Sequence, residues 1–285
     1  MTKVIYTSDP IRFSWRHVLP WSICRDILRH RGLIGSMTMR DFRATYQASY
    51  LGLTWQVVLP MIMLAIFYLV FGQILGGRFS NNGNETPIDY ALALFVGLGF
   101  FNFLSQNIGS APSLIISNVT YVKSLSFPLE ILPVISVLNA LINLLIGLVL
   151  ITLVLMVVKG NLHWSAICVP FYVVCIFLIA LGVSWGLSAL SVFIRDISAV
   201  TSPLTLILMF MCPIFYPASM VPKRIKWVIA TNPIAVIIED VRASFLYGVW
   251  PGPLSAAAIL SVSLLIASSG YFVFMRSKSA FADVM

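Results

Sequence analysis

Long apolar runs recur along this sequence and constrain its fold more than any other feature. A helix needs about 20 mostly apolar residues to cross the hydrocarbon core of a bilayer. Hydrophobic residues make up 59% of the chain and charged residues 10%, whereas soluble domains carry roughly 25% charged residues. The chain therefore lacks the polar residues to coat a soluble globule, and we predict an all-α integral membrane protein. The predicted transmembrane helices are residues 51–75, 90–116, 131–158, 166–192, 197–215 and 254–274.

These six spans divide the chain into three predicted parts. Residues 1–50 form a cytoplasmic N-terminal region, residues 51–275 the transmembrane domain and residues 276–285 a cytoplasmic tail. Between Ser22 and Met37, apolar residues recur at roughly helical spacing among basic ones, which predicts an amphipathic helix along the membrane surface. Charged residues interrupt the first part throughout, so we expect no cleavable signal peptide, and the first apolar run serves as an uncleaved anchor.

Residues 227–247 are apolar but do not read as a seventh span. They contain Asn232-Pro233 in the middle and Glu239-Asp240 near the end. Proline disfavours helix at the preceding residue, and adjacent carboxylates are costly at mid-membrane. We predict two short re-entrant helices here, between spans five and six. Such a break in a membrane is tolerated only where protein or water surrounds it.

The second span contains polar side chains at Asn102, Ser105, Gln106, Asn107 and Ser110. Because polar groups are costly against lipid, we expect them to face protein or water.

Two glycine pairs are spaced to let helices approach closely. They are Gly72-xxx-Gly76 and Gly182-xxx-Gly186.

The distribution of basic residues orients the spans. The side that holds the N-terminal region, the loops after spans two and four, and the C-terminal tail carries twice as many Lys and Arg as the other. By the positive-inside rule, both termini are predicted to be cytoplasmic. The basic residues at 223–226 lie on the opposite side and run against the rule.

Several classes of activity lack the residues they need. The chain has no G-x-x-x-x-G-K-[ST] phosphate loop and no H-E-x-x-H motif. Its cysteines show no C-x-x-C spacing, which predicts no metal site, and its basic residues form no dense run for nucleic acid. No ladder of charged residues for proton coupling lies within the spans, and Glu130 and Asp196 at span edges are expected to be paired or solvated. We therefore expect no catalytic residue and a separate energy source.

Four groups of residues lie at the edges of the predicted spans. They are Arg40-Asp41-Phe42-Arg43 with Tyr46, Ser49, Leu51-Gly52, Trp55 and Pro60; Asn118, Lys123, Phe127-Pro128-Leu129 and Pro133; Phe193 with Arg195-Asp196-Ile197; and Pro213-Ile214-Phe215-Tyr216-Pro217 with Pro222, Asn232-Pro233 and Arg242. In this order they resemble the membrane subunit of type-2 ABC exporters, especially those that export lipid-linked polysaccharides such as O-antigen, capsule and teichoic acid. No group is specific alone, but together they cover nearly the whole chain.

The resemblance implies two sets of residues on the cytoplasmic side. Lipid headgroups and the incoming substrate would meet Arg40, Arg43 and Trp55, for which membrane anchoring is the alternative role. Short coupling helices would contact the ATPase through Asn118, Tyr121, Lys123, Arg195 and Asp196, with residues 117–126 as the best candidate segment. For residues 117–126 the alternative is a plain loop. For Arg195-Asp196 it is a pair of charges that fixes the turn at a helix end.

The resemblance also implies two sets on the external side. An external gate would comprise Pro213, Tyr216, Pro217, Asn232, Pro233 and Arg242. An aromatic exit for sugars would comprise Trp227, Phe245, Tyr247 and Trp250, although an interfacial aromatic belt predicts the same enrichment.

We therefore predict the channel-forming permease of an ATP-driven exporter in the bacterial inner membrane. It would form a homodimer with two ABC ATPase subunits, which bind ATP and Mg²⁺, and it would move a glycan on a polyprenyl-diphosphate carrier. The alternatives are an exporter of drugs or small lipids from the same family, a membrane-embedded glycosyltransferase or acyltransferase, and a passive channel.

Overall fold

The computed structural model describes residues 20–47, 52–76, 86–123, 127–160 and 162–284, and every regular element among these residues is helical. Residues 1–19, Ser49 and Leu51 of the first motif, and residues 124–126 of the candidate coupling segment lie outside this part. The α-helices are α1 (Pro20–Arg29), α2 (Arg31–Gln47), α3 (Trp55–Phe67), α4 (Pro87–Ile116), α5 (Val119–Val122), α6 (Ile131–Lys159), α7 (Val169–Phe193), α8 (Ile197–Met211), α9 (Lys226–Thr231), α10 (Pro233–Leu246), α11 (Pro253–Ser277) and α12 (Phe281–Val284). A π-helix, η3 (Tyr68–Ile74), continues α3, and 3-10 turns are η2 (Gly52–Thr54), η4 (Trp164–Cys168), η5 (Ala218–Met220) and η6 (Lys278–Ala280).

Five of these segments are long and apolar enough to cross a membrane. They are Trp55–Ile74, Pro87–Ile116, Ile131–Lys159, Trp164–Phe193 and Pro253–Ala280, and they coincide with the predicted spans one to four and six. The predicted fifth span corresponds to α8, which has only 15 residues and ends at Met211 rather than at residue 215. At 1.5 Å per residue, α8 is about 22 Å long, shorter than the roughly 30 Å hydrocarbon core.

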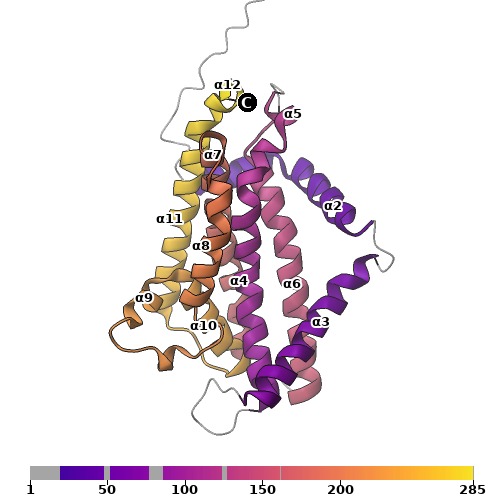
Figure 1. Ribbon diagram of the computed structural model, residues 1–285, viewed down its shortest axis with the longest axis vertical. Helices are drawn as coiled ribbons and strands as arrows, with labels where there is room; N and C mark the ends of the chain where they lie inside the picture. The colour runs from indigo at the N-terminus through magenta and orange to yellow at the C-terminus, as the bar shows by residue number, and fades with distance from the viewer. Residues whose placement is uncertain (1–19, 48–51, 77–85, 124–126, 161, 285) are drawn as a thin grey trace, which may run out of the picture.

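The long helices form a bundle with two distinct ends (Figure 1). Helices α5 and α12 lie at one end, here called the α5 end, and α9 and α10 lie toward the other, here called the α10 end. Helix α7 packs along both α11 and α4, and α6 packs against α4 and also contacts α7. Helix α3 meets α4 at the α10 end and diverges from the bundle toward the α5 end (Figure 1).

The predicted surface helix at Ser22–Met37 differs from the structure in extent and in environment. Two helices, α1 and α2, replace it and continue to Gln47. Its apolar residues Ile23, Ile34 and Met37 are buried in the hydrophobic core, and the Tyr271 hydroxyl of α11 donates to an Asp26 carboxylate oxygen at 2.6 Å. The apolar face that we assigned to lipid therefore packs largely on protein.

Glycine at two helix crossings brings backbones into direct contact. A Cβ on Gly182 of α7 would collide with the carbonyl of Ile266 on α11, and a Cβ on Gly270 would collide with Gly182 itself. At the α10 end, a Cβ on Gly72 would lie 2.7 Å from the Pro87 carbonyl oxygen. Both predicted glycine pairs thus contribute one residue to a close approach.

The Gly182 crossing predicts a position-specific cost of adding a methyl group. We expect Gly182→Ala to lower the free energy of unfolding by about 1–3 kcal/mol, as overpacking does. Gly109→Ala on α4 is the matched control, because nothing lies within 4 Å of its Cβ. Unfolding in detergent–SDS mixtures measures both, and equal stability of the two variants would contradict the close crossing.

Candidate functional site

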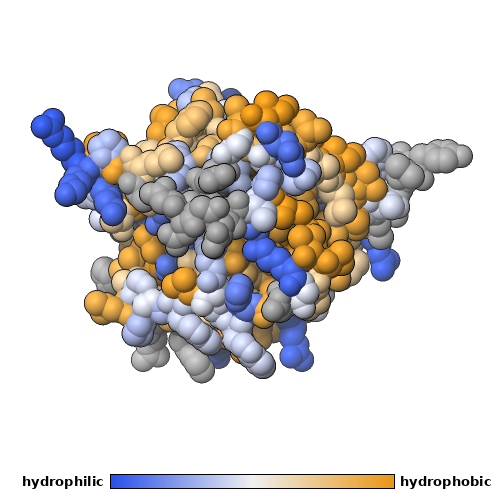
Figure 2. Space-filling model, turned by 90° about the horizontal axis from the view of Figure 1, so that it is seen from below, coloured by the Kyte–Doolittle hydropathy of each residue, from blue (hydrophilic) through white to orange (hydrophobic). Residues whose placement is uncertain are grey.

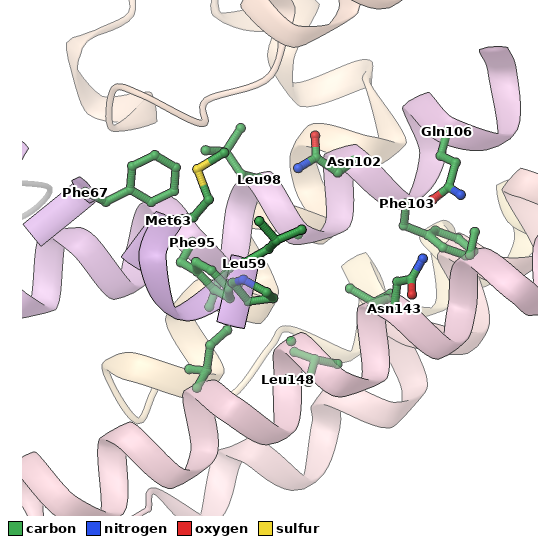
Figure 3. A pocket seen from close by; sticks show the side chains of 17 residues that line it. Leu59, Met63, Phe67, Phe95, Leu98, Asn102, Phe103, Gln106, Asn143 and Leu148 are labelled. Carbon is green, nitrogen blue, oxygen red and sulfur yellow. The ribbon is translucent and has the colours of Figure 1, made fainter. Parts of the chain in front are cut away.

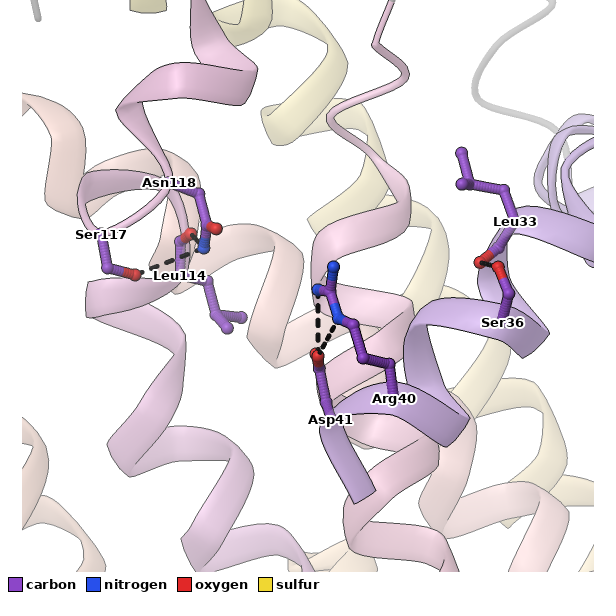
Figure 4. A network of polar contacts seen from close by, with 7 residues as sticks. All are labelled: Leu33, Ser36, Arg40, Asp41, Leu114, Ser117 and Asn118. Carbon is purple, nitrogen blue, oxygen red and sulfur yellow. Dashed lines mark hydrogen bonds and ion pairs between the residues drawn. The ribbon is translucent and has the colours of Figure 1, made fainter. Parts of the chain in front are cut away.

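Residues 117–123 and 127–130 lie between α4 and α6 at the α5 end and are here called the coupling hairpin. They include the candidate coupling helix α5. The Asn118 side chain donates to the Leu114 carbonyl at 2.8 Å, closing the end of α4 (Figure 4). The Tyr121 ring stacks on Phe127, with ring centroids 4.4 Å apart. Lys123 is exposed. Asn118 and Tyr121 therefore shape the hairpin, and Lys123 is available at its surface.

The candidate coupling residues Arg195 and Asp196 lie in the turn between α7 and α8. Both side chains are exposed, and the turn lies at the same end of the bundle as α5 (Figure 1). The α5 end therefore presents charged side chains from two separate turns.

Helix α2 carries the basic residues predicted to meet lipid headgroups. Arg40 pairs with Asp41 at 3.0 Å (Figure 4). Hydrogen bonds to the Tyr121 side chain and to Asp41 raise the pKa of Arg40 above its ordinary value. Arg43 is exposed, and Trp55 is half-buried at the start of α3. Arg40 and Arg43 thus lie at the exposed surface of α2, with Arg40 paired to its neighbour Asp41.

The chain after α8 leaves the helical conformation near the α10 end. Arg242 of α10 is only 4% exposed. Its guanidinium donates to the carbonyl oxygens of Pro213 at 3.0 Å, Ile214 at 3.3 Å and Ala93 at 3.2 Å. Gly97 leaves room for it, since a Cβ there would lie 2.8 Å from Arg242 Nη2. The side chain therefore joins the non-helical segment, α4 and α10.

The other predicted gate residues build the same region. The Asn232 side chain accepts from the Ile234 amide at 3.0 Å and so caps α10, while Pro233 occupies its first turn. Pro213 is buried and Pro217 half-buried, and the Tyr216 hydroxyl donates to the Phe210 carbonyl at 2.8 Å. The six predicted gate residues thus lie in one connected region.

Sequence reasoning missed two hydroxyl contacts that hold this region. The Tyr172 hydroxyl of α7 donates to Asp240 of α10 at 2.8 Å. The Tyr90 hydroxyl of α4 donates to the Phe215 carbonyl at 2.9 Å. Each tyrosine lies inside an apolar run, and its partner is far away along the chain, so periodicity carries no signal for it.

The predicted aromatic exit residues divide between surface and core. Trp227, Tyr247 and Trp250 are exposed, whereas Phe245 is buried at 5% exposure. Seen from the α10 end, hydrophilic and hydrophobic side chains are mixed across the surface (Figure 2). Three of the four aromatic residues could therefore contact a solute directly, and Phe245 packs inside the protomer.

A cleft of about 390 Å³ lies between α3, α4 and α6. Helix α3 contributes Leu59, Met63 and Phe67. The amides of Asn102 and Gln106 on α4 and of Asn143 on α6 line the part nearer the α5 end (Figure 3). Asn107 is buried and Ser110 contacts Ser136 of α6, as predicted for groups that face protein, whereas Asn102 and Gln106 are exposed along the cleft.

A family model described as ABC-2 type transporter matches residues 32–246 of this chain. The chain belongs to the ABC-2 type transporter family. It is therefore a membrane transport protein, and membership implies association with an ABC ATPase. The matched residues include α3 to α10, and so they include the coupling hairpin, the Arg242 region and the cleft.

Known relatives of this ABC-2 type transporter are permeases. The chain is 26% identical over 262 residues to the O-antigen export system permease protein RfbA of Myxococcus xanthus, covering 90% of this chain and 98% of the relative. It is also 26% identical over 257 residues to the protein of the same name from Klebsiella pneumoniae, covering 89% and 95%.

The Arg242 bridge predicts a local loss of protection when the guanidinium is removed. Arg242→Met leaves buried carbonyls unpaired, at about 1–3 kcal/mol for each such group. We expect faster amide hydrogen exchange at Ile214, Phe215 and throughout α10. Arg242→Lys should restore the protection only in part, because an ammonium lacks the planar fork of donors.

Arg224→Met is the matched control, because Arg224 is exposed in the turn before α9. Unchanged exchange in Arg242→Met would show that the bridge does not hold the segment.

Proposed function

We propose that this ABC-2 type transporter is the permease of an ATP-driven exporter that moves an O-antigen-like, lipid-linked polysaccharide out of the cytoplasm. The observation that carries the proposal is the similarity to an O-antigen export permease, which covers 90% of this chain and 98% of the relative. Two copies of the chain would enclose the path, and two ATPase subunits would supply the energy.

Charge supports an orientation with the α5 end in the cytoplasm. Basic residues at that end include Arg29, Arg31, Arg43, Lys123 and Arg195, all exposed. At the opposite end, Arg242 is one of the basic residues between the predicted fifth and sixth spans, but it is buried and bridges carbonyls, so it is not a loop charge. The loops at the α10 end therefore carry one basic residue fewer, which strengthens the excess of Lys and Arg on the predicted cytoplasmic side.

The α5 end offers the ATPase a surface made of two turns. Lys123 in the hairpin and Arg195-Asp196 in the α7–α8 turn are exposed. Helix α2 packs on α6, which follows the hairpin, and α8 leads from the second turn to the non-helical segment bridged by Arg242. A push by the ATPase at the α5 end would thus reach both the substrate entrance and the proposed external gate, where α9 and α10 would be re-entrant.

The α10 end supports a sugar exit. Trp227, Tyr247 and Trp250 are exposed there, and aromatic faces suit the C–H surfaces of sugars while polar ring edges remain wet. These residues would contact the glycan as it leaves between the two copies.

Purified permease–ATPase complex in lipid nanodiscs tests the proposal through its ATP hydrolysis. We expect a polyprenyl-diphosphate-linked glycan to stimulate hydrolysis, and short amphiphilic drugs to leave it at the basal rate. Stimulation by drugs alone would instead support an exporter of small amphiphiles, and would overturn the polysaccharide assignment.

Charge reversal at the proposed coupling surface gives a second prediction. We expect Lys123→Glu and Arg195→Glu to reduce glycan-stimulated hydrolysis by at least about fivefold, because unfavourable charge pairs weaken an interface. Lys223→Glu, at an exposed position before α9, is the control and should retain full stimulation. Equal rates for all three variants would place the ATPase contact elsewhere.

A further inference from the structure

The cleft between α3, α4 and α6 places uncharged amides where membrane-crossing helices would meet lipid. Asn102, Gln106 and Asn143 are exposed, and none of them makes a hydrogen bond to the part of the chain that the structure describes. Amide groups are costly against hydrocarbon unless a partner satisfies them. The cleft therefore requires an occupant that supplies hydrogen-bonding groups.

A second observation, an unpaired amide on α3, lies close to the cleft. Gln56 of α3 is 9% exposed, and its Nε2 has no hydrogen-bond partner among the described residues. It precedes Leu59, Pro60 and Met63 on the same helical face, and these three residues line the cleft. An unsatisfied donor in a buried position costs about 1–3 kcal/mol. An unpaired amide on α3 therefore lies within one turn of the cleft lining, of which Gln56 itself is not part.

The opposite part of the cleft is apolar. Met63, Phe67, Phe95 and Leu148 line it toward the α10 end (Figure 3). From Phe95 to Gln106 the lining extends over 11 residue steps of α4, or about 16 Å, roughly half the hydrocarbon thickness. A volume of about 390 Å³ lies near the lower limit of roughly 300–1,000 Å³ for small-molecule pockets. The cleft therefore suits one hydrocarbon chain better than the two chains of a diacyl lipid.

The shape of the cleft follows from how α3 is attached. Gly72 on η3 approaches the Pro87 backbone closely, so this helix is held against α4 at the α10 end. Toward the α5 end α3 diverges from the bundle, on the side of α2 (Figure 1). An amphiphile can enter from the leaflet at that end, hydrocarbon first.

We propose that this cleft binds the lipid anchor of the exported glycan, with one isoprenoid-type chain against Phe67 and Phe95 and the junction to the first sugar at the three amides. The inference rests on the proposed function and adds a binding site to it. Amide N–H groups donate to phosphoester oxygens, and amide carbonyls accept from sugar hydroxyls. The bound anchor would place the glycan beside α3, from which it can pass into the path between two copies.

Two glycines allow the cleft to be filled without disturbing the helices. The nearest atom to a Cβ on Gly99 is a Leu144 carbon at 3.8 Å, and on Gly147 it is a Phe95 carbon at 3.8 Å, both ordinary contacts. Larger side chains at these positions would extend into the cleft. Gly109→Leu is the matched control, since Gly109 is exposed on α4, has nothing within 4 Å of its Cβ and does not line the cleft.

The test uses the permease–ATPase complex in nanodiscs and a polyprenyl-diphosphate-linked sugar with a diazirine in its hydrocarbon chain. We expect the label on cleft residues of α3, α4 and α6 in the wild type and in Gly109→Leu. Labelling should fall about tenfold in Gly99→Leu and Gly147→Leu, the effect of displacing about two methylenes. The double variant Asn102→Leu/Asn143→Leu should lose the preference for this probe over a plain polyprenol.

Undiminished labelling in both glycine variants would overturn the inference. Displacement of the probe by excess diacyl phospholipid as readily as by unlabelled polyprenyl lipid would also overturn it, because bulk lipid would then fill the cleft. A cross-link that places a second copy of the chain in the cleft would overturn it as well. Glycan-stimulated ATP hydrolysis is measured in the same samples. Stimulation with the label outside the cleft would overturn the cleft alone, whereas loss of both stimulation and labelling in the wild type would overturn the proposed function as well.

Discussion

The non-helical segment after α8 depends on one buried guanidinium. Between Cys212 and Pro217 the chain cannot satisfy its own carbonyl groups by helical hydrogen bonds, and in a membrane each unpaired group costs several kcal/mol. Arg242 reaches the carbonyls of Pro213 and Ile214 and also that of Ala93 on α4. A buried charge is tolerated when dipoles and hydrogen bonds surround it. Arg242 therefore joins the segment after α8, the second turn of α4 and α10, and α8 leads from this region to the exposed turn at the α5 end.

Helix α3 is attached in a different way, and the difference has consequences for transport. Close packing between Gly72 and Pro87 holds this helix against α4 at the α10 end. Toward the α5 end it diverges from the bundle, and the amide-lined cleft lies between it, α4 and α6. The neighbouring helix α2 packs on α6, the helix that follows the coupling hairpin. A movement of α6 would be transmitted to α2, which also contacts η2 just before α3. In this account, one protomer contains a hydrogen-bonded region around Arg242 and a separately attached helix α3 beside the proposed anchor cleft.

Apolar length and local breakers predicted most of the fold. Runs of about 20 apolar residues located five of the membrane-crossing helices, and Asn232-Pro233 predicted the break between α9 and α10. The burial of Arg242 could not be predicted, because its carbonyl partners lie 149, 29 and 28 residues away in the sequence. Periodicity also identified the apolar face of α1 and α2, but it cannot distinguish a face that meets lipid from one that packs on protein. The glycines at 72 and 182 were found by spacing, whereas their partners at Pro87 and Ile266 were not.

Transport in proteoliposomes tests the central claim most directly. The permease and its ATPase are reconstituted with a lipid-linked polysaccharide in the outer leaflet, where the ATPase faces the external solution. After ATP is added, a membrane-impermeant glycosidase outside the vesicles reports how much glycan has been moved inside. The account predicts ATP-dependent protection of the glycan that requires both proteins. Protection produced by the permease alone, without the ATPase or ATP, or glycan that stays fully accessible while ATP is hydrolysed, would contradict it.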